Sequence, residues 1–219
     1  KKGTDDRLMK LSLPEIAKDN ALLQYAMSGG KAIFGDYCAS CHGSGGVGVK
    51  SGGFPTLADD DWLYGGDLST IQETISNGRS GQMPAHLQSA GGAFTEAHVD
   101  DLTEFVLSLS GRGKDGLAVQ RGALLFRGDA GCNGCHGDKG DGSVKGSISG
   151  SPLPPVGAPN LTDNIWLYGG DPATIRESIA RGRSGQMPAW GEAKAAGKKL
   201  TPLQIKQVTL YVHGLGGGQ

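Results

Sequence analysis

All four cysteines of this 219-residue chain lie in two short motifs, CASCH at 38–42 and CNGCH at 132–136. Two thiols spaced by two residues and followed at once by a histidine are typical of covalent haem attachment, in which the histidine ligates the iron. A thioredoxin-like redox pair, a four-cysteine zinc site and two short disulfides are competing interpretations, but none requires the histidine. The sequence therefore predicts two covalently bound haem c groups. Their attachment residues and proximal ligands would be Cys38, Cys41, Cys132, Cys135, His42 and His136.

The octapeptide GRSGQMPA, found at 78–85 and again at 182–189, offers a second axial ligand for each iron. Methionine opposite histidine is the ligand pair that raises the potential of an electron-transfer haem. Met83 follows the first haem motif and Met187 the second, in equivalent positions, and the proline after each disfavours a helix there. We therefore predict Met83 and Met187 as the distal ligands.

Three other histidines follow the haem motifs and are alternative ligands in principle. His86, His98 and His213 have no counterpart in the other half of the chain. We interpret them as ordinary surface or helix residues. The sequence GSGGVG at 43–48 matches a dinucleotide-binding pattern, but it follows a haem histidine and no strand, so it carries no such function.

The chain is a duplication. Residues 53–85 and 157–189 are identical at 22 of 33 positions, and both contain WLYGGD. The second copy has ten extra residues after its haem motif, where SVKGSISGSPLPP at 143–155 predicts a surface loop. The high glycine count of 39 and the low aromatic content of 6% suit two small domains in which a haem supplies much of each core.

Each copy predicts the same short series of helices, so the expected fold class is all-α. A first helix carries Gly30 or Gly122 and leads into the haem motif; a second ends at the glycine of GRSGQMPA; the last begins after Thr95 or Thr201 as N-cap. Glycine on the first helix would let an aromatic residue of the last helix approach closely. The expected boundaries are an N-terminal segment (1–29), domain 1 (30–110), a linker (111–116) and domain 2 (117–219).

These motifs are similar to those of a known family. The chain resembles paired class I cytochrome c domains, and GAPNLTDNIWLYGGDPATIRESIARGRSGQMPAW resembles the dihaem subunit III (CcoP or FixP) of cbb3-type cytochrome c oxidases. The resemblance implies an electron relay from a donor cytochrome c to the other subunits of a haem-copper oxidase. It also implies an N-terminal membrane anchor and a position on the periplasmic side of a bacterial inner membrane. No membrane-spanning run or leader is present in the chain, which we expect to be the periplasmic portion, with no nucleic-acid partner.

Further residues around each haem are candidates for binding or orienting it. Pro55 and Pro159 match the proline whose carbonyl accepts a hydrogen bond from the proximal histidine in class I cytochromes c, with a plain turn proline as the alternative. Aromatic residues could donate to haem propionates or simply pack, and two arginines could pair with propionates or lie in solvent. These candidates are Trp62, Tyr64, Arg79, Trp166, Tyr168 and Arg183.

Charge divides the two halves. The formal net charge of −1 combines −7 for residues 30–110 with +5 for residues 111–219 and +1 for residues 1–29. Such a division could steer a basic donor to an acidic first domain, or the two halves could attract each other. Three function classes remain: an oxidase relay subunit, a free dihaem carrier, and a dihaem peroxidase or sensor. Two equivalent methionines disfavour the last class, which needs an open iron site, and no catalytic residue is expected in a relay.

Overall fold

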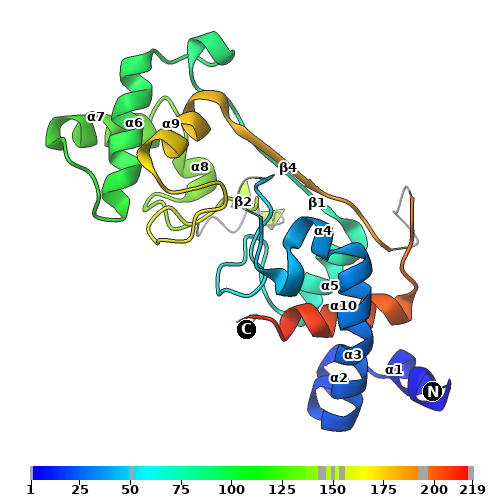
Figure 1. Cartoon of the computed structure of the whole chain (residues 1–219). Helices are drawn as coiled ribbons and strands as arrows, with labels where there is room; N and C mark the ends of the chain where they lie inside the picture. Colours follow the sequence, from blue (N-terminus) through cyan, green and yellow to red (C-terminus); the bar gives the residue numbers. More distant parts are fainter. Residues whose placement is uncertain are drawn as a thin grey trace. The chain divides into compact units, whose positions relative to one another are not determined.

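The computed structural model describes residues 2–49, 52–142, 147–148, 151–152, 156–191 and 197–216 (Figure 1). Most of the regular secondary structure in the described residues is helical. The longer helices are α1 (Lys2–Lys10), α2 (Leu13–Lys18), α3 (Asn20–Tyr37), α5 (Leu68–Asn77), α6 (Glu96–Leu109), α7 (Gly116–Arg127), α9 (Pro172–Arg181) and α10 (Pro202–His213). Short helices are α4 (Ala39–His42), α8 (Asn133–His136), η1 (Ser44–Gly46) and η3 (Gln88–Ala90).

The chain also contains strands, which corrects the expected all-α fold to a mainly helical one. β1 (Arg79–Met83) pairs with β4 (Arg183–Met187), and β2 (Ser147–Ile148) pairs antiparallel with β3 (Ser151–Pro152). β1 and β4 are the two copies of RSGQM. No strand signal is visible in the sequence because these segments are short and contain no β-branched residue, and each finds its partner 104 positions away.

The predicted helix boundaries are confirmed. Thr95 and Thr201 cap α6 and α10 through their side chains, and Asp67 and Asp171 cap α5 and α9. The glycines that follow α5 and α9 end these helices with positive φ. The loop predicted at 143–155 lies largely outside the described residues; β2 and β3 are its described parts.

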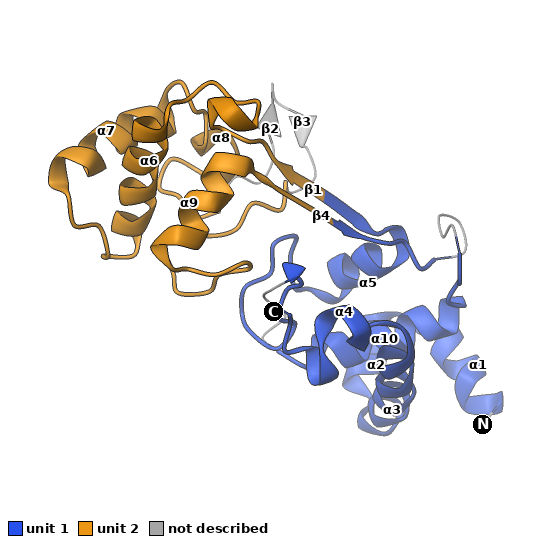
Figure 2. Cartoon of the chain, turned by 45° about the horizontal axis from the view of Figure 1, so that its top comes forward, with its two compact units in different colours: residues 1–80, 186–219 blue, residues 81–185 orange. Residues whose placement is uncertain are grey.

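The chain forms two compact units, of which the first is assembled from two segments that are far apart in sequence (Figure 2). Unit 1 comprises residues 1–80 and 186–219, and unit 2 comprises residues 81–185. The expected domains at 30–110 and 117–219 therefore differ from the compact units. The chain leaves unit 1 within β1 and returns to it within β4. The last helix of the first repeat, α6, therefore belongs to unit 2, and the last helix of the second repeat, α10, belongs to unit 1.

Unit 1 is built on the crossing of α3 with α10. Gly30 lies where the helices meet: a Cβ there would lie 2.7 Å from the Gln207 carbonyl carbon and 2.7 Å from Tyr211 Cβ. Tyr211 packs on Phe34 with ring centroids 5.4 Å apart. The expected glycine–aromatic approach is present, but the last helix comes from the second repeat.

Unit 2 repeats this crossing with α7 and α6. A Cβ at Gly122 would lie 2.7 Å from the Asp101 carbonyl carbon and 2.7 Å from Phe105 Cβ, and Phe105 packs on Phe126 at 5.0 Å. Here the last helix comes from the first repeat. Among the described residues, no helix is long and apolar enough to cross a membrane.

Candidate haem sites

The first haem motif lies directly after the longest helix of unit 1. α3 ends at Tyr37, and α4 carries Cys41 and His42 on one short turn. The His42 side chain is buried, with 8% of the residue exposed, and its Nδ1–H donates to the Pro55 carbonyl oxygen at 3.1 Å. That bond fixes the tautomer and leaves Nε2 free to act as a metal ligand. Burial lowers the pKa of His42, partly opposed by the Pro55 carbonyl, and so favours the neutral imidazole that a metal requires.

The second motif has the same geometry in unit 2. His136 on α8 is equally buried, at 8% exposed, and its Nδ1–H donates to the Pro159 carbonyl oxygen at 3.0 Å. Burial lowers the pKa of His136 as well, against the effect of that carbonyl. Both predicted prolines therefore lie within hydrogen-bond distance of the predicted proximal ligands.

Cys38 and Cys132, the first cysteines of the two motifs, pack against the apolar cores, whereas Cys135 is exposed. All four are described and none forms a disulfide. Burial, first, and the neighbouring cysteine raise the pKa of Cys38 to about 11; burial likewise raises the pKa of Cys132 to about 11. The described residues contain no group of three or more His, Cys, Asp or Glu side chains that could hold a metal ion. Each motif therefore places its first thiol at the apolar core of its unit.

The methionines lie in the opposite units from those expected. Met187 packs against the apolar core of unit 1, whose partly buried members include Cys38 and Trp62. Met83 packs against the core of unit 2, with Cys132 and Trp166. The structure therefore brings Met187 into the unit of His42 and Met83 into the unit of His136.

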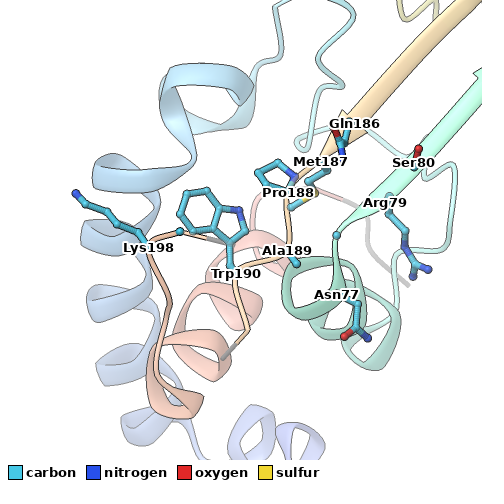
Figure 3. Close-up of a pocket in the computed structure, with 11 residues that line it drawn as sticks. Asn77, Arg79, Ser80, Gln186, Met187, Pro188, Ala189, Trp190 and Lys198 are labelled. Carbon is cyan, nitrogen blue, oxygen red and sulfur yellow. The ribbon is translucent and has the colours of Figure 1, made fainter. Parts of the chain in front are cut away.

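The glycines of GRSGQMPA have a second purpose beside ending helices. A Cβ at Gly78 would lie 2.5 Å from the Met187 carbonyl oxygen, and a Cβ at Gly182 would lie 2.8 Å from the Ala85 amide nitrogen. Each glycine therefore accommodates the methionine–proline backbone of the other repeat. A hollow of about 640 Å³ adjoins Met187, Trp190 and Lys198 (Figure 3). Its lining includes neither His42 nor a cysteine, so it lies beside the methionine segment and not at the proximal face.

The aromatic and arginine candidates form a similar pair in each unit. Arg79 lies 4.8 Å from the ring centroid of Tyr64 and donates to Thr74 Oγ1 at 2.9 Å. Arg183 lies 4.5 Å from the ring of Tyr168 and donates to the Ser178 hydroxyl at 2.8 Å. Both arginines are therefore held by stacking and by the helix before them, with Arg79 also paired to a carboxylate, Glu73, at 3.2 Å.

Two buried polar atoms without a partner lie at these sites. Trp62 Nε1 is buried and makes no hydrogen bond within the described chain. One terminal nitrogen of Arg112 is equally buried and unpaired, while its guanidinium lies 5.2 Å from the Trp166 ring and donates to the Gly170 carbonyl oxygen. Arg112 was missed from the sequence because it lies in the linker before α7. Buried donors without partners are costly in a finished fold, so both indicate an acceptor supplied by a bound group such as a carboxylate.

These features together fit a porphyrin in each unit. Two thiols, an imidazole with a fixed tautomer, a methionine packed in the same core and an unpaired indole or guanidinium donor define c-type cytochrome units. The family profile described as "Cytochrome C oxidase, cbb3-type, subunit III" matches residues 26–106 and 117–212. The chain belongs to this family.

Curated relatives agree along nearly the whole chain. It is 44% identical over 218 residues to the cbb3-type cytochrome c oxidase subunit FixP of Azorhizobium caulinodans, covering 97% of this chain and 68% of the relative. It is 43% identical to the subunit CcoP of an Azospirillum species, covering 95% and 68%. It is 40% identical to CcoP of Cereibacter sphaeroides, covering 97% and 69%. The profile follows the two repeats in sequence order, whereas the compact units exchange their last helices.

Proposed function

We propose that this chain binds two covalent haem c groups and relays electrons within a cbb3-type cytochrome c oxidase. The observation that carries the proposal is the repeated arrangement of a buried histidine, oriented by a proline carbonyl, in a unit that also packs a methionine into its core. One such site would suit many haem proteins. Two of them, in a member of this oxidase family, favour a relay with two redox centres.

The proposed ligand pairs are crossed between the repeats. His42 and Met187 would ligate the iron of unit 1, and His136 and Met83 the iron of unit 2. Packing supports this pairing, since each methionine contacts the apolar core that also contains the other repeat's first attachment cysteine. Cys38 and Cys41 would hold the first haem and Cys132 and Cys135 the second.

The protein's own residues orient and shield the redox centres. The haem supplies one-electron chemistry when bound, so the relay needs no catalytic acid or base. Pro55 and Pro159 hold the imidazoles through their Nδ1–H groups, and this bond makes each histidine a stronger ligand. The α3–α10 and α7–α6 crossings exclude water from the core. Trp62 and Arg112 would donate to propionate oxygens.

The partners follow from the family. The relatives are named as oxidase subunits, and we propose that this chain likewise assembles with the other subunits and accepts electrons from a donor cytochrome c. A periplasmic site, next to a bacterial inner membrane to which the complete protein would be anchored, is part of the same proposal. A free dihaem carrier would use the same sites, and co-purification with an oxygen-reducing subunit separates the two.

Mass and ligand binding test the haem sites directly. The denatured protein should carry two haem additions, whereas one addition would contradict the proposal. The ferrous protein should not bind carbon monoxide, because both irons have two axial ligands. Met187→Ala should open one iron to carbon monoxide and Met83→Ala the other. Carbon monoxide binding by the unaltered protein would instead favour a sensor or a peroxidase.

A further inference from the structure

The last helices of the two repeats are equivalent in position but differ where they face their neighbours. The backbones of Asp101 on α6 and Gln207 on α10 occupy the same place, each against the glycine of the crossing helix. Aligning the helices on this crossing matches three pairs of residues with unlike side chains. They are Asp101 with Gln207, Asp100 with Lys206, and Glu104 with Leu210. We call these six residues the selector positions.

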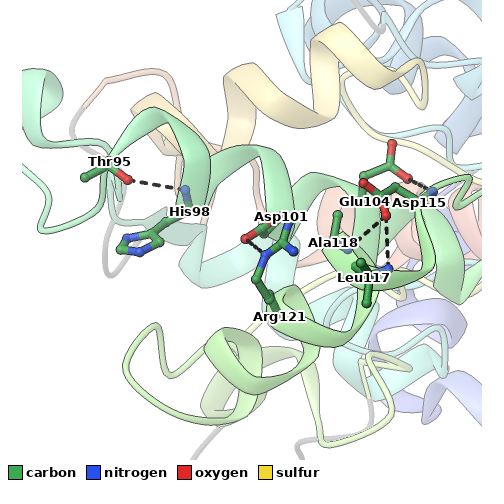
Figure 4. Close-up of polar contacts among 8 residues, drawn as sticks. All are labelled: Thr95, His98, Asp101, Glu104, Asp115, Leu117, Ala118 and Arg121. Carbon is green, nitrogen blue, oxygen red and sulfur yellow. Dashed lines mark hydrogen bonds and ion pairs between the residues drawn. The ribbon is translucent and has the colours of Figure 1, made fainter.

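In the first selector pair, Asp101 favours the packing of α6 against α7. Arg121 forms two hydrogen bonds to Asp101, at 2.7 and 2.6 Å, and the Asp101 side chain is only 10% exposed (Figure 4). Gly29 occupies the place of Arg121 in α3. Packing α6 against α3 would therefore leave a nearly buried carboxylate without its cation, which is strongly unfavourable.

The reverse mismatch is steric. A Cβ at Gly29 would lie 2.5 Å from Gln207 Nε2, so the Gln207 side chain lies in the space that glycine leaves. Arg121 at the equivalent place of α7 has no such space for Gln207. The pairs Gly29–Gln207 and Arg121–Asp101 therefore favour the packing in which each last helix joins the other repeat.

The second selector pair matches each last helix to other neighbours. Asp100 accepts a hydrogen bond from Arg176 on α9 at 2.6 Å, and Glu96 contacts the same guanidinium. Lys206 instead donates to the Leu8 and Met9 carbonyl oxygens at the end of α1, both at 3.0 Å. Exchanging them would set Lys206 against Arg176 and Asp100 against carbonyl oxygens, and both contacts are repulsive.

In the third selector pair, Leu210 makes apolar contacts, whereas Glu104 makes hydrogen bonds. Leu210 is 2% exposed in a core with Leu8, Leu13 and Ile16 of the N-terminal segment. Glu104 accepts a hydrogen bond from the backbone amide of Lys114 at 2.8 Å. It accepts another from the backbone amide of Asp115 at 3.2 Å, at the start of α7 (Figure 4). Glu104 at the place of Leu210 would bury a charge among aliphatic side chains.

The exchange of the last helices also redistributes the charge of the two halves. Unit 1 contains 12 Lys and Arg against 11 Asp and Glu, and unit 2 contains 9 against 11. Net charges of +1 and −2 replace the −7 and +5 of the consecutive halves. Opposite charges of the two repeats thus meet inside each unit, and each unit is close to neutral.

We infer that the selector positions decide which last helix closes each unit, and through it which methionine reaches which iron. Each last helix follows its methionine along the chain after a short connection, so the helix brings the methionine strand with it. The selector residues are positioning residues that act through packing and charge. The inference rests on the crossed ligand pairs proposed above and adds the side chains that enforce them.

Cleavage of the linker between α6 and α7 tests the inference. A protease site inserted after Gly113 divides the chain into fragments that each contain one haem motif. In the exchanged fold both units contain parts of both fragments, so the cleaved protein should elute from a sizing column as one particle with two haems. Clean separation into two one-haem fragments would overturn the crossed pairing itself.

The selector residues are tested in the same cleavable chain. A variant with all six exchanged (Asp100→Lys, Asp101→Gln, Glu104→Leu, Lys206→Asp, Gln207→Asp, Leu210→Glu) should separate after cleavage. If it elutes as one particle and retains the red absorption band of methionine-ligated ferric haem, the selector inference is wrong although the crossed pairing stands.

A charge reversal at the Asp101–Arg121 pair tests the same inference if the sixfold variant does not bind its haems. Asp101→Arg alone should weaken the fragment complex and the methionine band of one haem, because the new guanidinium would face that of Arg121. Adding Arg121→Asp should restore both, since the pair reforms only if α6 packs on α7. Absence of any effect from Asp101→Arg, or of any rescue by the second change, would contradict the inference.

Discussion

Replacing Gly30 with alanine should destabilise unit 1 markedly, although alanine is the better helix former. Gly30 lies inside α3, where α10 crosses it. An added Cβ would lie 2.7 Å from both the Gln207 carbonyl carbon and Tyr211 Cβ. The ordinary separation of such atoms is about 3.5–4.0 Å, so the two helices must move apart by roughly 1 Å.

The size of the effect follows from two opposing terms. Glycine to alanine in a helix interior gains about 1 kcal/mol from propensity. Overpacking of a rigid contact costs about 1–3 kcal/mol and more where backbone atoms must move. Since the clash is with the α10 backbone and not with the end of a flexible side chain, we expect the cost to lie at the upper end of this range and the net loss to be about 1–2 kcal/mol.

Gly35 on the same helix is the matched control. A Cβ at Gly35 meets no atom within 4 Å, so Gly35→Ala should leave stability unchanged or raise it by about 1 kcal/mol. Guanidinium unfolding of both holo variants, followed by far-UV circular dichroism, gives the comparison. Equal midpoints for Gly30→Ala and Gly35→Ala would refute the close helix crossing.

Three further changes test other parts of the sites. Met187→His should lower the midpoint potential of one haem only, because imidazole replaces the thioether that favours ferrous iron, and NMR should assign the change to the haem attached at Cys38. Asp67 accepts hydrogen bonds chiefly from Ser69 and Thr70, and these bonds lower its pKa from 3.8 to about 2. Because the pKa is lower in the folded state, the ionised carboxylate stabilises the protein above about pH 4, and this contribution is lost as the pH falls towards 2. Asp67→Asn should therefore flatten the fall of melting temperature over that range. Arg112→Leu should shift the potential of the second haem and change its pH dependence if the unpaired guanidinium nitrogen meets a propionate, and an unchanged potential would contradict that contact.

Features that depend on a few neighbouring residues could be predicted from the sequence. The two C-x-x-C-H motifs, the capping Thr95 and Thr201, and the glycines that end α5 and α9 each depend on a few neighbouring residues, and all lie where the patterns predict. The crossing glycines Gly30 and Gly122 were also identified correctly. The physical reason is that caps, turns and close contacts place strict demands on one residue type.

The exchange between repeats could not be predicted in the same way. GRSGQMPA is identical in both copies, so nothing within the octapeptide that carries Met83 or Met187 assigns either methionine to one of the two proposed iron sites. The distinguishing signal lies in unlike residues far apart in sequence, such as Arg121 with Asp101, and it becomes readable only when the helix crossing is known. Strands β1 and β4 could not be predicted for a similar reason. They are strands because they pair with each other, and their composition does not favour a strand.

The exchanged helices impose an order on the biogenesis of the protein. His42 is synthesised early, but the methionine of its unit follows 145 positions later, and α10 later still. The first unit therefore completes its core only when almost the entire chain has emerged. Unit 2 is one uninterrupted segment and can close sooner. Maturation should accordingly run against the direction of translation, with the second redox centre finished before the first, and a truncation near the C-terminus should damage the N-terminal centre most.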